Sequence, residues 1–219
     1  MSDEFLFTAS TIRKAFDRLS EILEQQHIVG EVFMVGGGAM ILAYDARVST
    51  QDIDAVFHPT GPVRRAALQV ALEQGLPDDW LNDGAKGFMP GPDRQPVPTY
   101  EGPGLRVASG SPPYILAMKL MAFRDEKDVD DIRFLMHKCA LESVEEALDL
   151  MQEYYPHQQL SIRSQLKLEE MLGQQARREA AAAPVRPRMS KAKCGYQSVH
   201  MSGPCKRPPH HSGSHKSNP

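Results

Sequence analysis

The chain has 219 residues, of which 41% are hydrophobic and 24% charged, and its formal net charge is −3. This composition is typical of globular proteins, and so small a net charge excludes a protein that binds polyanions through its overall charge. No run of about 18 apolar residues occurs, so no membrane-spanning helix is predicted. The first residues, "MSDEFLFTAS", carry acids and no basic segment, so we expect no secretory signal and a cytoplasmic protein without membrane contact.

Strands and helices alternate in the first half of the sequence. Helical spacing of apolar residues predicts a helix over 11–27 that ends at Gly30. Further helices are predicted over 39–45, after three glycines, and over 62–75, with Gly75 at the end. Short apolar runs predict strands at 31–35, 51–57 and 104–109. Residues 77–104 predict a long loop with one short helix, in which Trp80, Asn82 and Asp83 either border a pocket or, for Trp80, join the core.

The second half of the sequence is helical. Four helices are predicted, over 111–125, 128–140, 143–155 and 161–183. Ser111 is a plausible N-cap of the first of them, and Ser143 with Glu146 predicts a capping box for the third. A mixture of strands and helices followed by helices alone indicates an α+β fold with a small sheet and a helical region behind it.

Asp52 and Asp54 form an Asp-apolar-Asp motif. Residues two apart in a strand face the same side, so the two carboxylates are expected to lie together while Ile53 enters the core. Two adjacent carboxylates repel each other, and a divalent cation with a preference for oxygen ligands, such as Mg²⁺, removes that conflict. The alternative is an exposed strand edge that holds no metal.

Three glycines, Gly36, Gly37 and Gly38, lie between a predicted strand and a predicted helix. A glycine-rich turn at a helix N-terminus lets backbone N–H groups approach a phosphate, and the helix dipole favours the anion. The alternative is a tight strand-to-helix turn without a ligand. Since the strand with Asp52 and Asp54 follows this helix, the sequence predicts a phosphate site beside a metal site.

This order of motifs resembles the nucleotidyltransferase superfold, the group built like DNA polymerase beta. Within it, "GGGAM" followed by Arg47, Thr50 and "DID" is similar to the AbiEii-like and related uncharacterised bacterial nucleotidyltransferase-like families. The stretches "GLPDDWLNDGAKGF" and "LAMKLMAFRDEKDVDDIRFL" are similar to later parts of such families, so the resemblance covers about residues 10–155. It implies a polymerase-beta-like sheet, Mg²⁺ on Asp52 and Asp54, and a nucleoside triphosphate bound by Gly36, Gly37, Gly38, Arg47, Thr50, Lys119 and Arg124.

Lys119 lies in an otherwise apolar predicted helix. A lysine there either extends to water or serves a buried site, and the resemblance implies that it reaches nucleotide phosphates with Arg124 assisting. From the residues themselves, Arg47 and Thr50 are expected mainly to fix the strand and the glycine turn, with Thr50 also able to bind a phosphate.

Asp128 and Asp131 share one helical face at i,i+3 spacing. They either pair with a neighbouring lysine or arginine, or complete the catalytic set with Asp52, Asp54 and Lys119. The question matters because the resemblance implies a third carboxylate on a later strand, whereas "GLRVAS" offers only Ser109.

The C-terminal tail carries the only other cluster of metal-ligand residues. Cys194, Cys205, His211 and His215 supply two thiolates and two imidazoles, which suit tetrahedral Zn²⁺. His210 is an alternative to His211, and the whole segment is otherwise a disordered basic tail. The sequence thus predicts a structural zinc knuckle that folds with its metal.

Two hypotheses follow for function. The first is a Mg²⁺-dependent nucleotidyltransferase that moves a nucleoside monophosphate to RNA, including tRNA, to a protein or to a small molecule; the family implies a toxin–antitoxin role with an antitoxin or regulatory partner. The alternative is a catalytically weak protein that binds nucleotide or a partner, with the zinc knuckle as an adaptor. The predicted domains are 1–155 nucleotidyltransferase-like, 156–183 a helix, 184–193 a linker, and 194–219 the knuckle.

Overall fold

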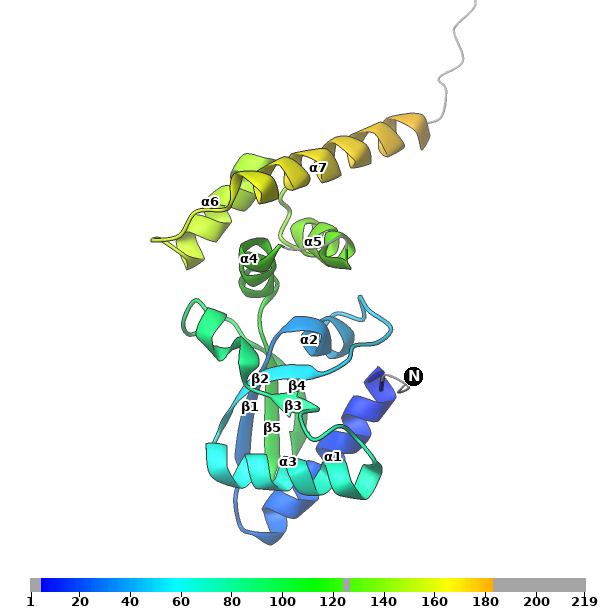
Figure 1. The fold of residues 1–219 in the computed structure, drawn as a ribbon, viewed down its shortest axis with the longest axis vertical. Coiled ribbons are helices and arrows are strands. Elements are labelled where there is room, and N and C mark those ends of the chain that lie inside the picture. The colour runs from blue at the N-terminus through cyan, green and yellow to red at the C-terminus, as the bar shows by residue number, and fades with distance from the viewer. Residues whose placement is uncertain (1–4, 124–126, 183–219) are drawn as a thin grey trace, which may run out of the picture. The chain divides into compact units, whose positions relative to one another are not determined.

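The structure is a computed structural model, and it describes residues 5–123 and 127–182. Contacts group the chain into two units, Met1–Ala176 and Arg177–Pro219, and the sheet and the candidate site lie in the first. The described residues form an α+β fold with a mixed five-stranded sheet and seven α-helices, as the sequence predicts (Figure 1). None of the helices in this part of the chain is long and apolar enough to cross a membrane.

The sheet has the strand order β3-β2-β1-β5-β4. β1 runs antiparallel to β2 and parallel to β5, β3 runs parallel to β2, and β4 runs antiparallel to β5. In chain order the strands are β1 Gly30–Met34, β2 Ile53–His58, β3 Leu81–Asn82, β4 Val97–Gly102 and β5 Leu105–Ser109. β2 and β5 therefore lie on opposite sides of β1.

Helices α1 (Ala9–Gln25) and α3 (Thr60–Gln74) cover one face of the sheet (Figure 1). Thr8 begins α1 with a capping box, and Gly75 ends α3 in the left-handed conformation, at φ 66°. The predicted stop at Gly30 is wrong, because Gly30 begins β1. A Cβ at Gly30 would lie 2.9 Å from Leu23 and 3.1 Å from Val63, so the missing side chain lets both helices approach the strand.

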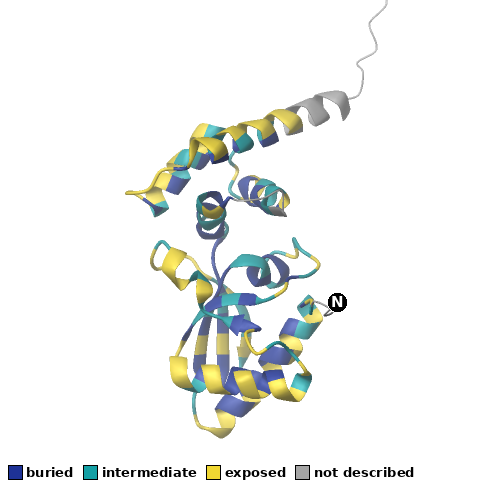
Figure 2. Cartoon of the chain, viewed as in Figure 1, coloured by how far each residue is buried: buried dark blue, intermediate teal, exposed yellow. Residues whose placement is uncertain are grey.

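Strand alternation separates a buried face from an open one (Figure 2). Val32 of β1 and Val107 of β5 are buried under the helices. The residues that precede them, Glu31 and Arg106, are exposed on the other face. The register places Glu31 opposite His58 of β2, which is exposed as well. The core therefore lies on the α1–α3 side of the sheet.

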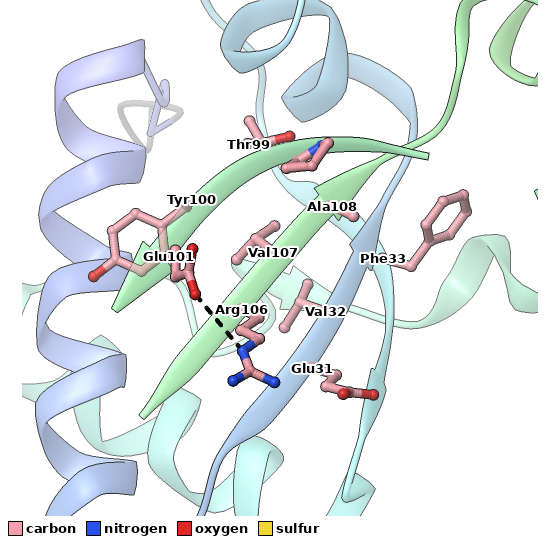
Figure 3. Close-up of a pocket in the computed structure, with 10 residues that line it drawn as sticks. Glu31, Val32, Phe33, Thr99, Tyr100, Glu101, Arg106, Val107 and Ala108 are labelled. Carbon is pink, nitrogen blue, oxygen red and sulfur yellow. Dashed lines mark ion pairs between the residues drawn. The ribbon is translucent and has the colours of Figure 1, made fainter. Parts of the chain in front are cut away.

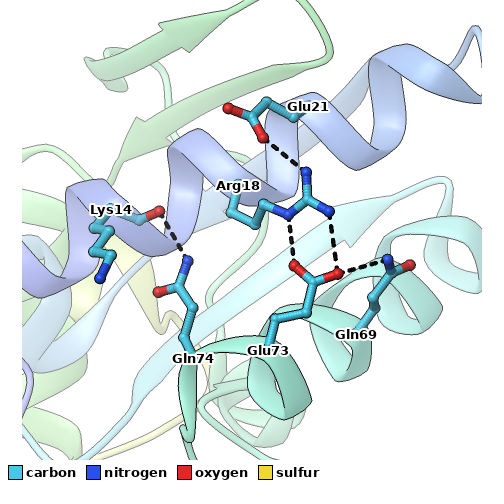
Figure 4. A network of polar contacts seen from close by, with 6 residues as sticks. All are labelled: Lys14, Arg18, Glu21, Gln69, Glu73 and Gln74. Carbon is cyan, nitrogen blue, oxygen red and sulfur yellow. Dashed lines mark hydrogen bonds and ion pairs between the residues drawn. The ribbon is translucent and has the colours of Figure 1, made fainter.

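A polar network joins α1 to α3 at the surface (Figure 4). Arg18 donates to both carboxylate oxygens of Glu73, at 2.6 and 3.1 Å, and to Glu21 at 2.7 Å. Gln69 also donates to Glu73, at 2.8 Å. The hydrogen bonds from Arg18 and Gln69 lower the pKa of Glu73 to about 2. The two helices are thus linked outside the core as well as through it.

Residues 77–104, predicted to be mainly loop, contain β3, a 3₁₀ helix η1 (Gly84–Phe88) and β4. Trp80 belongs to the core: it is 0% exposed, and its indole N–H donates to the Ala67 carbonyl at 2.9 Å. Two tyrosine hydroxyls hold the end of η1 and the stretch after it. Tyr155 donates to the Phe88 carbonyl at 2.6 Å, and Tyr114 donates to the Gly91 carbonyl at 2.7 Å. These long-range contacts leave no local trace in the sequence.

The remaining elements are helices that follow the predicted order. They are α4 Pro112–Ala122, α5 Lys127–Lys138, α6 Val144–Tyr154 and α7 Ile162–Ala182. Ser111 is the N-cap of α4, and the capping box of Ser143 and Glu146 is confirmed. The Tyr114 ring of α4 contacts the Phe33 ring of β1 edge-on, with centroids 5.4 Å apart. Because Phe33 lies on the open side of the sheet, α4 packs against that side near the end of β1.

Candidate functional site

The glycine turn and Asp54 lie in direct contact. Gly36, Gly37 and Gly38 form the first turn of α2 (Gly36–Leu42) rather than preceding the helix as predicted. Gly36 has φ 62°, and a Cβ built there would lie 2.8 Å from Asp54 Oδ2. The Val35 N–H also donates to the Asp54 backbone carbonyl, at 2.8 Å. Glycine is therefore required both by the backbone conformation and by the carboxylate beside it.

Thr50 and Arg47 hold the turn from the side of Gly37. The Thr50 hydroxyl occupies the space that a Cβ of Gly37 would need, and Arg47 Nη1 lies 3.1 Å from the same position. Backbone hydrogen bonds of 2.7 and 2.9 Å tie Thr50 to Phe7. These contacts agree with the expectation that Arg47 and Thr50 fix the turn. The N-cap of α2, Val35, supplies no side-chain acceptor to the N–H groups of the first turn.

Asn82 of β3 joins the two aspartates. Its Nδ2 donates to Asp52 Oδ2 at 3.0 Å, and the amide also opposes the rise in the pKa of Asp54 that burial causes. Register places Asn82 directly beside Asp54, while Asp52 immediately precedes β2. The carboxylates thus lie together, as the motif predicts. Asn82 was noted in the sequence only as a residue near a pocket, because a strand of two residues has no periodicity to reveal its neighbours.

Burial and repulsion act on Asp54. Both aspartates are half-buried. Burial raises the pKa of Asp54, and the charge of Asp52 raises it further, whereas the Asn82 hydrogen bond and the charge of Lys119 oppose the shift. The arrangement holds two like charges together with incomplete compensation, a condition that clusters at functional sites.

Lys119 of α4 is the centre of an ion-pair cluster rather than a lysine that extends to water. Its side chain is 11% exposed, and its Nζ lies 3.0 Å from Asp128 Oδ1 and 2.7 Å from Asp131 Oδ2. Arg47 Nη2 lies 3.2 Å from the same Asp131 oxygen. Since Arg47 also contacts Gly37, the cluster connects α5 to the glycine turn.

Asp128 and Asp131 of α5 do not pair with Arg133. That arginine pairs with Asp130 at 2.9 Å on the surface. Asp131 is 4% exposed and its Oδ2 makes no hydrogen bond within the described residues, so its contacts with Lys119 and Arg47 are charge–charge contacts. Most of the predicted site is therefore brought together: the glycines, Arg47, Thr50, Asp52, Asp54, Lys119, Asp128 and Asp131.

Other predicted residues lie elsewhere. Ser109 is buried and bonds the Thr99 hydroxyl at 2.7 Å, on a strand that does not border β2. The strand "GLRVAS" is thus separated from the aspartate strand by β1, and the two strands that border β2 are β1 and β3, the latter with Asn82. Asp83 pairs with Arg64 at 2.8 Å. The residues that lie outside the described part are Arg124, Cys194, Cys205, His211 and His215.

A separate hollow of about 660 Å³ lies on β1, β4 and β5 (Figure 3). Glu31, Phe33 and Ala108 contribute to its lining, and Arg106 lies 3.9 Å from Glu101 at its side. Neither aspartate lines it. The hollow is thus adjacent in topology to the aspartate strand but is not the site itself.

The donor set can be compared with the needs of Mg²⁺. Two carboxylates converge, and in the described residues no group of three His, Cys, Asp or Glu side chains could hold a metal. Mg²⁺ is usually bound by one or two carboxylates together with waters and substrate phosphates. Asp52 and Asp54 fit that requirement, provided that a ligand supplies further oxygens.

No protein-family model, curated protein or solved structure matches this chain.

Proposed function

We propose that the chain is a Mg²⁺-dependent nucleotidyltransferase with a polymerase-beta-like site, as its resemblance to AbiEii-like families implies. The observation that carries the proposal is the contact between the Asp54 carboxylate and the Gly36 turn, with Asp52 beside it. Neither feature alone identifies a function. Together they support the proposal, because two carboxylates that suit Mg²⁺ lie beside a glycine turn whose backbone can approach a phosphate closely.

Each residue of the site has a role in this proposal. Mg²⁺ held by Asp52 and Asp54 would neutralise negative charge on the triphosphate. The backbone N–H groups of the glycine turn donate to phosphate oxygens. Lys119 and Arg47 add positive charge, while Asp131 keeps both side chains in place.

The proposed reaction is a displacement at the α-phosphorus. The oxygen of an acceptor hydroxyl forms a bond to phosphorus, the bond to the bridging oxygen breaks, and pyrophosphate leaves with that electron pair. The hydroxyl proton passes to an aspartate oxygen or to water. The acceptor is RNA, a protein or a small molecule, and tRNA and an antitoxin-like partner remain expectations from the resemblance.

A second function, nucleotide or partner binding without turnover, is favoured by one observation. The strand beside β2 supplies Asn82, an amide, and no third carboxylate joins the pair within the described residues. A metal held by two carboxylates is held less strongly than by three, and turnover is expected to fall with its occupancy.

Radiolabelled nucleotides distinguish the two functions. The full chain is incubated with Mg²⁺ and each α-³²P-labelled NTP, alone and with total tRNA, and label transfer and nucleotide binding are both measured. We expect Asp54→Ala to reduce transfer at least about 100-fold, since it removes a metal ligand from the reacting centre. Asp130→Asn, on the exposed side of α5, is the control. Binding without transfer under every condition supports the second function. If the protein shows no binding and no transfer, both functions are contradicted.

The zinc knuckle is a separate proposal. Zinc is measured by mass spectrometry in the wild type and in Cys205→Ser. We expect about one zinc per chain, with loss in the variant, because a tetrahedral site needs all four ligands. Equal zinc content in the two proteins contradicts the proposal.

A further inference from the structure

The side-chain amide of Asn82 has a fixed orientation. Its Oδ1 accepts the Gly84 N–H at 2.9 Å, so its NH₂ group is the end that faces Asp52, at 3.0 Å. An amide NH₂ donates hydrogen bonds and offers no lone pair to a metal. Towards the aspartates, Asn82 is therefore a hydrogen-bond donor and not a cation ligand.

The backbone around Asn82 is held as well. The Ile53 N–H donates to the Trp80 carbonyl at 2.8 Å, and Trp80 is anchored in the core. β3 pairs with β2 so that Asn82 lies beside Asp54. A side chain on so fixed a segment is placed well enough to set the chemistry of its neighbours.

A free divalent cation would meet a limited set of ligands here. Asp52 and Asp54 supply two carboxylates, and one oxygen of Asp52 already accepts the Asn82 amide. No third acidic, histidine or cysteine side chain joins them within the described residues. Cation affinity depends strongly on the number of charged ligands, so this set is weak for a bare ion.

We infer that Asn82 is a positioning residue that limits the site to two carboxylates, so that a divalent cation binds tightly only together with the phosphates of a nucleotide. The inference rests on the proposed function for the identity of the second ligand. The phosphates supply the missing oxygen ligands. The role of Asn82 in limiting the affinity for the free cation is independent of that identity.

Asn82→Asp tests this role directly. Aspartate has the shape of asparagine and retains the oxygen that accepts the Gly84 N–H, so the fold of η1 is expected to persist. Mn²⁺, a spectroscopic substitute for Mg²⁺, is titrated alone by electron paramagnetic resonance and by calorimetry. A third carboxylate is expected to tighten Mn²⁺ binding by about tenfold or more. The thermal midpoint of the variant is also expected to rise on Mn²⁺ addition more than that of the wild type.

Two variants control for charge. Gly87→Asp adds the same charge to the same segment, at a position where a Cβ meets nothing within 4 Å, and is expected to leave Mn²⁺ affinity within about twofold of wild type. Asp52→Asn combined with Asn82→Asp returns the site to two carboxylates and is expected to restore weak binding. If Asn82→Asp binds Mn²⁺ no more tightly than the wild type, or Gly87→Asp gains equally, the role of Asn82 is contradicted.

A second titration separates the inference from the proposed function. The wild type is titrated with a non-hydrolysable ATP analogue in Mn²⁺, and with the analogues of the other three bases. Binding that is tight with nucleotide and weak with Mn²⁺ alone supports both. If no nucleotide binds while Asn82→Asp still gains Mn²⁺ affinity, the proposed function is wrong and the role of Asn82 in limiting the free cation stands. If the wild type binds Mn²⁺ tightly in the absence of nucleotide, the inference is overturned whatever the nucleotide result.

Discussion

Two regions of the molecule differ in how they are built: the core beneath α1 and α3, and the charged region where β1 ends and β2 begins. Beneath α1 and α3 the core is apolar, and the buried indole N–H of Trp80 has a hydrogen-bond partner. In the charged region, by contrast, Asp52 and Asp54 repel each other beside a cluster of four further charges. Sites of function commonly break the local rules that stabilise the rest of a domain. The contrast is consistent with a first region that maintains the fold and a second region that carries the proposed chemistry.

The largest effect is expected in the apolar region, for Trp80→Ala. This side chain is 0% exposed and loses both its volume and its hydrogen bond to Ala67, so the free energy of unfolding is expected to fall by about 3–5 kcal/mol. Urea denaturation followed by circular dichroism measures it. A loss below about 1 kcal/mol would contradict the assignment of Trp80 to the core.

Asp131→Asn is expected to come next. Asp131 is buried between Lys119 and Arg47, and its neutralisation leaves two cations without their shared partner. We expect unfolding to become easier by about 3 kcal/mol, since breaking a buried ion pair is costly. Asp130→Asn is the matched control, because Asp130 has a 91% exposed side chain and is expected to change stability by less than about 0.5 kcal/mol. Equal effects in the two variants would show that the cluster is not special.

Gly36→Ala is best compared with Gly75→Ala, which serves as the control for backbone strain. Both glycines have positive φ, 62° and 66°, but a Cβ at Gly75 meets nothing, whereas one at Gly36 meets the Asp54 carboxylate. Gly75→Ala is therefore expected to cost about 1 kcal/mol from backbone strain alone. Gly36→Ala is expected to cost about 2 kcal/mol and also to weaken nucleotide binding. Chemical denaturation and nucleotide titration of both variants measure the difference, and equal costs would place the carboxylate elsewhere.

Asp54→Asn is expected to have the smallest effect, with the opposite sign. The pKa of Asp54 is raised by burial and by Asp52, so its ionised form destabilises the folded state above that pKa. The variant is expected to be more stable than wild type by about 1 kcal/mol at neutral pH, while losing activity.

The advantage of Asp54→Asn is expected to shrink on acidification. As the pH falls through the raised pKa towards the ordinary value of 3.8, wild-type Asp54 takes up a proton and the penalty disappears. Thermal unfolding of both proteins across this range tests the sign. A variant that is less stable than wild type at neutral pH would contradict the repulsion.

Much of this contrast is present in the sequence, but unevenly. Strand alternation predicts that the two carboxylates lie together, and the Gly-Gly-Gly turn predicts their neighbour, because both are local patterns. Local caps such as Ser143 with Glu146 are predicted for the same reason. The role of the glycines differs in part from the prediction. Gly36 and Gly37 leave room for the Asp54 and Thr50 side chains, and the three glycines form the first turn of α2 instead of preceding it.

The features that sequence reasoning missed depend on distant residues. β3 has two residues, and its place beside β2 follows from the tertiary position of Trp80. The pairing of Lys119 with Asp131 joins α4 to α5, and Arg47 enters from a loop some eighty positions earlier in the chain. No window of ten or twenty residues contains these partners, so periodicity and propensity could not identify them.

The tyrosine hydroxyls that hold Phe88 and Gly91 have one more consequence. Tyr155 is the C-cap of α6 and Tyr114 lies in α4, so both helices hold the segment that follows Asn82. Removing α6 would release one of these two hydrogen bonds a few residues from the aspartate pair. The position of the segment beside the aspartates therefore depends on the helices. A shortened chain without α6 would keep every aspartate and glycine of the site but would lose one of the two hydrogen bonds that hold this segment.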